Sequence, residues 1–306
     1  MKPVKVGICG LGTVGGGTFN VLQRNAEEIS RRAGRGIEVA QIATRSPKPQ
    51  FETTGIAITN DVFAVATNPE IDIVIELVGG YTVARELVLK AIENGKHVVT
   101  ANKALLAAHG SELFAAAEAA GVDLLFEAAV AGGIPFIRPL RESLLAEPVL
   151  RVMGIMNGTT NYILTRMSEA GADYSEALAE AQSLGYAEAD PTFDIEGVDA
   201  AHKITLLSSL AFGVPVQFDK AYIEGITKLT KEDIQFAEQL GYRVKLLGIA
   251  KRTEQGVELR VHPTLIPSKR LIANVEGVMN AVLVKANAVG PTLYYGAGAG
   301  SLPTAS

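Results

Sequence analysis

Val4-Lys-Val-Gly-Ile-Cys-Gly-Leu-Gly-Thr-Val-Gly15 is a short apolar run that ends in a glycine-rich turn. The run Val4–Cys9 predicts a buried strand, and the stretch from Thr13 to Arg24 predicts a helix. This order gives the G-x-G-x-x-G pattern the context of a dinucleotide-binding unit, because the glycines admit a pyrophosphate and the helix N-terminus supplies amide donors. A glycine turn without a ligand is the alternative. The predicted cofactor contacts are Gly10, Leu11, Gly12, Thr13, Val14 and Gly15.

The rest of the first half alternates apolar runs with helical stretches, as a doubly wound α/β domain does. The strand candidates are Ile37–Thr44, Ile71–Leu77, His97–Thr100 and Asp123–Glu127. Ligands of such sheets bind beyond the carboxyl ends of the strands. Lys103 follows one of these ends, so we count it among the candidate contacts of cofactor or substrate. We predict a Rossmann-type dinucleotide-binding domain over residues 1–134.

The end of the second strand bears on the choice between NAD and NADP. NAD-specific sites place an acidic residue there to bind the ribose 2′-hydroxyl, whereas an arginine accommodates a 2′-phosphate. This chain has Arg45 at that point, with Lys48 close behind. The sequence therefore indicates NADP or NAD, with NADP slightly preferred, and an exposed loop arginine is the alternative.

Bulk properties exclude several classes of protein. The 306 residues include 48% hydrophobic and 20% charged residues, which is typical of a globular chain. The net charge of −5 disfavours a nucleic-acid surface, and we find no apolar run long enough for a membrane span. The single cysteine, Cys9, excludes an intramolecular disulfide and favours a reducing, cytoplasmic location.

The second half of the chain mixes helices with longer strand-like runs, which predicts an α+β domain on a mostly antiparallel sheet. The strand candidates are Leu150–Met156, Tyr242–Arg252, Val257–Pro267 and Ala281–Val289, and a helix is expected over Ile137–Leu145. We assign residues 135–290 to this substrate-binding and dimerisation domain. Residues 291–306, glycine-rich again, are predicted to return to the dinucleotide-binding domain.

Acidic residues and a lysine gather between Ala181 and Lys203. Gly185 and Pro191 predict a loop over residues 185–194, and the helix after it is expected to start near Asp194 or Gly197. Asp199 and Lys203 then lie one turn apart on one helix face, where a surface ion pair is the ordinary interpretation. The helix is too apolar for a solvated one, and the loop adds further carboxylates, enough to grip a small polar molecule. These carboxylates belong to Glu188, Asp190 and Asp194.

This stretch resembles the signature of homoserine dehydrogenases. The matching positions are Ala181, Gly185, Tyr186, Asp190, Pro191, Asp194, Ile195, Gly197, Asp199 and Lys203. Two further segments, Glu127–Pro135 and Asn157–Asn161, are similar to motifs of the same family. The resemblance implies NAD(P)-dependent interconversion of L-aspartate 4-semialdehyde and L-homoserine, a step toward threonine and methionine. It also implies a homodimeric enzyme with two domains in each chain.

The resemblance also implies roles for individual residues. Lys203 transfers the proton, Asp199 holds that lysine or the substrate ammonium, and Lys103 lies on the nicotinamide side as a competing proton donor. The implied substrate contacts are Glu188, Asp194, Asp199 and Lys203, and Gly185 and Gly300 join the cofactor contacts.

The Glu127–Pro135 segment contains Gly132-Gly133-Ile134-Pro135, which cannot continue a strand. From the residues alone it predicts a structural hinge. The resemblance implies a sodium site made of backbone oxygens, contributed by Glu127, Val130, Gly132 and Ile134.

Two alternative functions remain to be weighed. A semialdehyde dehydrogenase working through a thioester needs a cysteine nucleophile, and Cys9 lies inside the first strand. A non-catalytic NADP-sensing protein has no use for Asp199 and Lys203.

In the segment Asn157–Asn161, helix capping is favoured over ligand contact by Thr160. The helix of the family continues beyond Ser306, which leaves open a regulatory domain further on.

Overall fold

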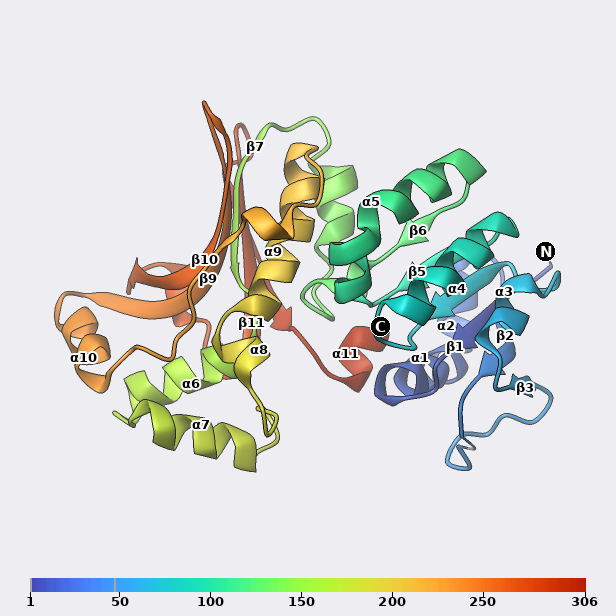
Figure 1. Cartoon of the computed structure of the whole chain (residues 1–306), viewed down its shortest axis with the longest axis horizontal. Coiled ribbons are helices and arrows are strands. Elements are labelled where there is room, and N and C mark those ends of the chain that lie inside the picture. Colours follow the sequence, from blue (N-terminus) through green and yellow to red (C-terminus); the bar gives the residue numbers. More distant parts are fainter. Residues whose placement is uncertain (1, 47) are drawn as a thin grey trace. The chain divides into compact units, whose positions relative to one another are not determined.

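A computed structural model describes residues 2–46 and 48–306 of the chain. The chain divides into two compact units, one that extends to Gly133 and also takes in Gly300–Ser306, and one formed by Ile134–Ala299. The first unit carries a parallel sheet and the second a mixed, mostly antiparallel sheet (Figure 1). The predicted fold class is confirmed.

The sheet of the first unit has the strand order β3-β2-β1-β4-β5-β6, and each of its neighbouring pairs is parallel. Its strands are β1 (Val4–Cys9), β2 (Ile37–Ala43), β3 (Ala57–Thr59), β4 (Ile73–Glu76), β5 (His97–Thr100) and β6 (Leu124–Leu125). The direction of winding reverses between β1 and β4, and such a reversal opens a crevice at the carboxyl ends of the strands.

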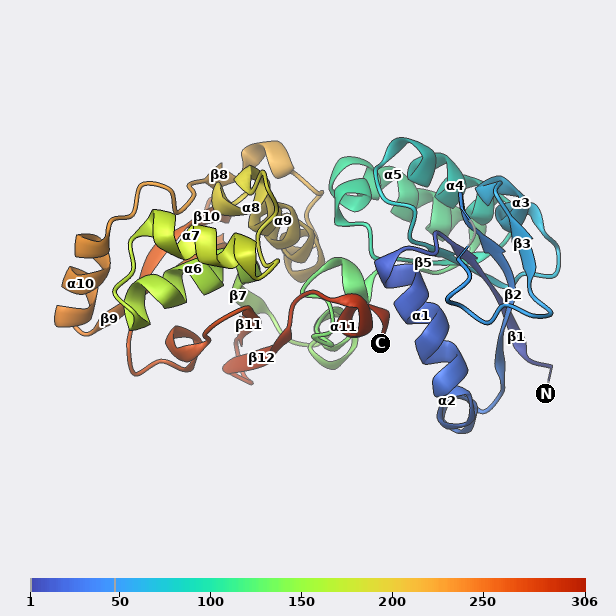
Figure 2. The ribbon, with the colours of Figure 1, turned by 90° about the horizontal axis from the view of Figure 1, so that it is seen from below.

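Helices cover both faces of this sheet (Figure 2). They are α1 (Thr13–Arg24), α2 (Ala26–Ala33), α3 (Val62–Thr67), α4 (Thr82–Glu93), α5 (Lys103–Ala120) and, from the end of the chain, α11 (Ser301–Ala305). A buried cluster joins α1 to the sheet through Phe19, Ile8 and Ile42. This packing fixes the helix whose N-terminus follows the glycine turn.

The sheet of the second unit has the order β12-β11-β7-β9-β10-β8, with antiparallel pairs except for β10 and β8. Its strands are β7 (Val149–Ile155), β8 (Tyr222–Ile223), β9 (Tyr242–Thr253), β10 (Gly256–Pro267), β11 (Met279–Ala286) and β12 (Pro291–Ala297). Because Pro291–Ala297 pairs with β11, the segment that returns to the first unit begins at Gly300 and not at residue 291.

Five helices pack around this sheet, namely α6 (Gly158–Glu169), α7 (Tyr174–Ser183), α8 (Thr192–Ile195), α9 (Val198–Phe212) and α10 (Lys231–Gln239). The loop prediction for residues 185–194 was wrong at its end, because α8 begins at Thr192 after the Pro191 turn. The helix expected over Ile137–Leu145 is a π-helical turn, Pro139–Ser143, and it starts at a proline. Three-residue 3₁₀ turns occur at Glu127–Ala129 and Phe218–Lys220.

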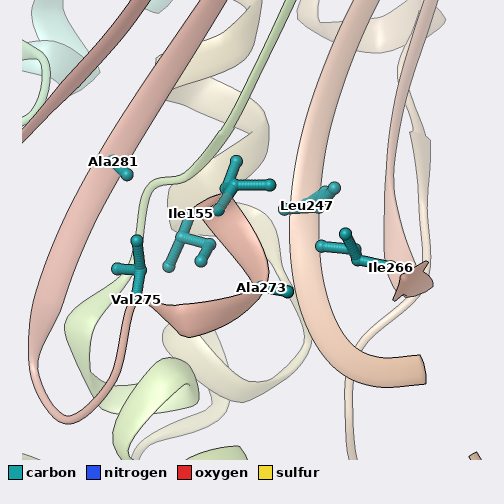
Figure 3. Close-up of a cluster of buried hydrophobic side chains, with 7 residues drawn as sticks. Ile155, Leu247, Ile266, Ala273, Val275 and Ala281 are labelled. Carbon is teal, nitrogen blue, oxygen red and sulfur yellow. The ribbon is translucent and has the colours of Figure 1, made fainter. Parts of the chain in front are cut away.

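The short 3₁₀ segment Leu271–Asn274 packs against the second sheet. Ile272 and Ala273 from this segment pack with Ile155, Leu247 and Ala281 of the sheet, as Figure 3 shows for four of these residues. In the part of the chain that the structure describes, no helix combines the length and apolar character needed to cross a membrane.

Candidate functional site

A different structural reason accounts for glycine at each of the three positions of the G-x-G-x-x-G turn. Gly10 has a φ of +103°, and a Cβ atom there would overlap the Leu77 carbonyl. A Cβ atom at Gly15 would overlap the Gly10 carbonyl, so Gly15 lets α1 approach the strand. Gly12 is exposed with open space beside its Cα. Two glycines therefore shape the turn, and the third leaves room for a ligand.

A cavity of about 440 Å³ lies beside this turn. Its lining includes Gly10, Leu11 and Gly12 from the turn, Arg45 and Lys48 from the loop after β2, and Leu77, Val78 and Gly79 from the turn after β4. The cavity lies where β1 and β4 end and the strand order reverses, which is the usual ligand position in such sheets. Thr13, Val14 and Gly15 belong to the start of α1 behind it.

Lys103 is the first residue of α5, and only Ala101 and Asn102 separate it from the end of β5. Asn102 caps this helix, because its side-chain oxygen accepts from the Leu105 amide at 3.1 Å. The Asn102 side-chain nitrogen donates to the Gly80 carbonyl at 2.6 Å. The cap thus ties the Lys103 turn to the turn after β4.

The second unit brings a lysine and two carboxylates together around Asn157. We call Asn157, Asp194, Asp199 and Lys203 the Asp199–Lys203 cluster. Lys203 donates to the Asp199 carboxylate at 2.7 Å and to the Met156 carbonyl at 2.6 Å. The two charged side chains are only 11% and 5% exposed, so this pair is a buried one and the surface ion-pair interpretation does not hold.

Asn157 joins the two carboxylates of the cluster. Its side-chain nitrogen donates to Asp194 Oδ1 at 2.7 Å and to Asp199 Oδ2 at 2.9 Å. Its side-chain oxygen accepts from the Thr160 amide at 2.9 Å and so caps α6. The prediction of capping at this segment is confirmed, but the bridge to the carboxylates was not predicted.

Asp194 is held in place from two sides. The Thr159 hydroxyl lies 3.1 Å from its second oxygen and 2.6 Å from the Tyr186 carbonyl, and these two acceptors share its single proton. Burial raises the pKa of Asp194 above its ordinary value, and the nearby Asp199 charge acts in the same direction. The hydrogen bonds from Asn157 and Thr159 oppose these effects. A cationic ligand beside Asp194 would also favour its charged form.

The remaining residues of the predicted substrate loop lie nearer to solvent. Glu188 is exposed, and its backbone carbonyl accepts from the Gln182 side chain at 3.1 Å. Asp190 accepts from the Thr192 amide and hydroxyl, which starts α8. Gly185 has a φ of +73° directly after α7, the position where helices commonly end in a glycine. These contacts give each residue a local structural role beside the predicted one.

The predicted cation-binding segment makes a tight turn. Glu127–Ala129 forms a 3₁₀ turn, and Ala131 and Gly132 follow with φ values of +58° and +52°. Val130, Gly132 and Ile134 are buried. Within residues 2–46 and 48–306, no group of three or more His, Cys, Asp or Glu side chains is arranged to hold a metal ion. Any cation here would therefore depend on carbonyl oxygens.

The end of the chain packs on the helix that follows the glycine turn. Gly300 has a φ of +125° and precedes α11, and Ser301 donates to the Thr13 carbonyl at 2.8 Å. A Cβ atom at Gly17 would meet Ser301 Oγ at 2.6 Å, so Gly17 permits the close approach of α11 to α1. The return segment thus supports the N-terminus of α1.

Cys9 is fully buried in β1, and this burial raises the pKa of its thiol to about 12. The thiol is therefore uncharged at neutral pH, whereas a thioester mechanism needs a thiolate. The thiol-dependent alternative is not favoured.

Comparison with known families covers nearly the whole chain. Residues 135–306 match the family described as homoserine dehydrogenase. Residues 10–127 match the family described as the homoserine dehydrogenase NAD-binding domain. These two matches correspond closely to the two compact units.

Individual relatives agree with the family matches. The homoserine dehydrogenase of Pseudomonas aeruginosa is 70% identical over 306 residues, which are all of this chain and 70% of that protein. That of Bacillus subtilis is 43% identical and is matched over 71% of its length. The crystal structure of a homoserine dehydrogenase from Thiobacillus denitrificans has a TM-score of 0.96 at 65% identity, over all of this chain and 71% of that one.

A more distant structure is also informative. A hyperthermophilic archaeal homoserine dehydrogenase in complex with NADPH has a TM-score of 0.84 at 29% identity, over 99% of this chain and 94% of that one. The likeness thus extends from close to remote members, and a non-catalytic sensing protein is not favoured. The chain belongs to the homoserine dehydrogenase family of NAD(P)-dependent oxidoreductases.

Proposed function

We propose that the Asp199–Lys203 cluster binds the amino-acid substrate and that Lys203 transfers the proton of the reaction. The observation that carries this proposal is the burial of the Lys203–Asp199 pair, 11% and 5% exposed, beside a second carboxylate. Such a site offers one cationic donor and two anionic acceptors in a small volume. A zwitterionic amino acid with a terminal oxygen matches that pattern.

A bound nicotinamide supplies or accepts the hydride at the terminal carbon of the substrate. During reduction the carbonyl oxygen takes a proton, and the Lys203 ammonium is the donor we assign. Asp199 and Met156 accept from two of its three N–H donors, and we assign the third to the substrate oxygen. During oxidation the neutral amine takes the proton back from the hydroxyl.

The carboxylates have a separate role in this proposal. Asp194 and Asp199 hold the substrate ammonium, and the exposed Glu188 adds charge at the entrance. Asn157 donates to both buried carboxylates and so offsets the repulsion between them. Lys103 is the competing proton donor, because it begins α5 at the carboxyl edge of the parallel sheet.

On the cofactor side we propose NADP as the preferred dinucleotide. Arg45 lines the cavity at the end of β2, together with Lys48. A guanidinium at this position suits a 2′-phosphate, whereas an acidic residue would suit the unphosphorylated ribose. The predicted cofactor contacts further include every residue from Gly10 to Gly15, together with Lys103, Gly185 and Gly300. The cytoplasm remains the predicted location.

We further propose a sodium ion at the turn after β6, bound by the carbonyls of Glu127, Val130, Gly132 and Ile134. The successive positive φ values at Ala131 and Gly132 support it, because they reverse the chain within two residues. Hard cations prefer oxygen ligands, and backbone carbonyl oxygens are among these ligands. The role we assign is structural.

Finally, we propose that the protein is a homodimer formed through the second unit. A cavity of about 730 Å³ lies on its sheet, and its floor is apolar, with Met153, Leu247, Ile249 and Leu283 among its lining residues. An apolar face of this kind suits burial against a second copy. Sedimentation of the wild type and of Leu283→Lys tests this, and a monomeric wild type would contradict it.

The central proposal is tested by following the absorbance of the reduced nicotinamide with aspartate 4-semialdehyde as substrate, and with homoserine in the reverse direction. Lys203→Met is compared with Lys228→Ala, an exposed lysine of the same unit. We expect the first variant to lose turnover in both directions and the second to retain it. Near wild-type turnover in Lys203→Met would exclude Lys203 as the proton donor.

A further inference from the structure

Glu76 is a fully buried carboxylate in the last position of β4. A buried charge is costly unless hydrogen bonds compensate it. The Glu76 carboxylate accepts two such bonds, one from the Val78 amide at 2.9 Å and one from the Thr100 hydroxyl at 2.6 Å. Neither the sequence patterns nor the proposed proton transfer gives this residue a role.

Strand register explains why Glu76 reaches both partners. Glu76 pairs with Cys9 on β1 and with Thr100 on β5. These three residues stand side by side at the carboxyl edge of the parallel sheet, directly before the turns that follow the strands. The carboxylate is therefore placed between the turn after β4 and the turn after β5.

The first bond fixes a wall of the cofactor cavity. Leu77, Val78 and Gly79 line this cavity together with the glycine turn. The Leu77 carbonyl lies so close to Gly10 that a Cβ atom there would overlap it. A shift of the turn after β4 therefore changes the space available beside the glycine turn.

The second bond leads to the turn that carries Lys103. Thr100 Oγ1 accepts from the Asn102 amide at 3.0 Å, and the Asn102 side chain donates to the Gly80 carbonyl at 2.6 Å. Gly80 ends the same turn that the Val78 amide begins. The hydrogen bonds thus form a closed ring through Glu76, Thr100, Asn102 and the turn after β4.

We propose that Glu76 is a positioning residue, whose carboxylate fixes the turn after β4 and the turn after β5 relative to each other. It acts on the dinucleotide through the cavity wall and on Lys103 through the Asn102 cap. Its effect on the dinucleotide is independent of the catalytic roles proposed above, and only its effect on Lys103 rests on them.

Glu76→Gln is the first test variant. A glutamine side chain keeps the volume but is neutral and has a single acceptor atom, so one of the two bonds loses its acceptor and the other loses the charge of its acceptor. We expect the Kd of NADPH, measured by fluorescence with the full chain, to rise by roughly tenfold to a hundredfold, as the loss of a hydrogen bond to a charged group implies. We also expect faster hydrogen exchange at residues 77–80 and 100–105 without any cofactor.

Thr100→Val separates the two bonds, because it removes the hydroxyl and keeps the shape of the side chain. Exchange is expected to increase at residues 100–105 and to stay near the wild-type rate at residues 77–80. In the double variant, hydrogen exchange at residues 100–105 should be as fast as in Glu76→Gln alone, since both changes disrupt the same hydrogen bond between Glu76 and Thr100. Additive effects of the two changes there would contradict the ring.

Lys96→Met is the matched control for loss of a buried charge. Lys96 is 5% exposed, and its ammonium donates to the Ile71 carbonyl at 2.7 Å, at the opposite edge of the same sheet. We expect a lower free energy of unfolding, with NADPH affinity and exchange at both turns unchanged. The proposal is overturned if Glu76→Gln binds NADPH like the wild type, or if Lys96→Met weakens NADPH binding equally.

These readouts do not depend on turnover. If the chain binds NADPH but Lys203 has no part in proton transfer, the affinity and exchange measurements still decide the role of Glu76. Wild-type affinity and exchange in Glu76→Gln would reject that role while leaving the proton-transfer proposal untouched.

Discussion

Lys203 Nζ lies 2.7 Å from Asp199 Oδ2, one helical turn earlier on α9, and both side chains are almost completely buried. Removing one partner of a buried pair leaves the other charge uncompensated, which is strongly destabilising. Variants at either residue therefore change stability as well as chemistry. Unfolding must be measured beside activity for each of them.

Lys203→Ala should lower the rate of hydride transfer by about 10²–10⁴-fold, the contribution typical of a general acid–base group. The measurement is pre-steady-state oxidation of NADPH by aspartate 4-semialdehyde, with NADPH affinity measured separately. Lys103→Ala is the comparison. Retention of hydride transfer in Lys203→Ala with its loss in Lys103→Ala would exchange the two roles.

Asn157→Asp should move the acidic limb of the pH profile to higher pH. The variant keeps an acceptor for the α6 cap but removes the donor that lowers the pKa of Asp194, and it adds a like charge. The pKa of Asp194 then rises further, so protonation abolishes its attraction for the substrate ammonium at a higher pH than in the wild type.

The profile of kcat/KM for homoserine between about pH 5 and 8 checks this change, since it reports groups of the free enzyme. Thr160→Val serves as its control, because Thr160 contacts Asn157 but neither carboxylate in the described hydrogen bonds. An acidic limb at the wild-type position in Asn157→Asp would show that the amide does not tune Asp194.

Arg45→Ala should weaken NADP binding by roughly tenfold to a hundredfold and leave NAD binding nearly unchanged, because only the contact with the 2′-phosphate is lost. Isothermal titration with both dinucleotides gives the ratio directly. Lys48 is a second cationic residue that lines the cavity, and Lys48→Ala tests whether it contributes to the preference for NADP. Equal losses for NADP and NAD in Arg45→Ala would remove the assignment.

Sodium should raise the thermal stability of the wild type relative to choline at the same ionic strength, because a bound ion stabilises the folded state. Gly132→Val should lower Tm in both salts and abolish the difference, since a branched residue is strained at a φ of +52°. Gly121→Ala, another left-handed position outside the turn, should lower Tm and keep the difference. A sodium effect that persists in Gly132→Val would place the ion elsewhere.

Lys245 should make the protein more stable as pH rises above about 8. Burial lowers the pKa of this lysine from 10.5 to about 8, although its ammonium donates to the Val275 carbonyl at 2.6 Å. Between these values the unfolded chain binds more protons than the folded one, so the free energy of unfolding increases with pH. The increase from this residue is on the order of 3 kcal/mol at most.

Urea unfolding at pH 7.5 and pH 10 measures this dependence, and the comparison of wild type with Lys245→Met isolates it from other groups that titrate. The methionine variant should lack most of the increase. Lys251→Met, at an exposed position further along β9, should retain it. The same pH dependence in wild type and Lys245→Met would contradict the lowered pKa.

The sequence alone determined the features that depend on neighbouring residues. The glycine turn between β1 and α1, the pairing of Asp199 with Lys203 and the cap by Asn157 all follow from local geometry, because turns, helix spacing and caps act over a few residues. The alternation of strands and helices likewise predicted the fold class. The boundaries at Thr192 and Gly300 were less determined, because pairing and packing fix them.

Tertiary structure decided which distant residues meet. Asn157 is separated from Asp194 by 37 positions and from Asp199 by 42, and no local pattern brings them together. In the sequence, Glu76 is an ordinary strand residue. The register of three parallel strands nevertheless places its carboxylate within hydrogen-bond distance of Thr100, which lies 24 positions away. Such contacts depend on strand register and on the packing of whole elements, and neither is encoded in the spacing of neighbouring residues.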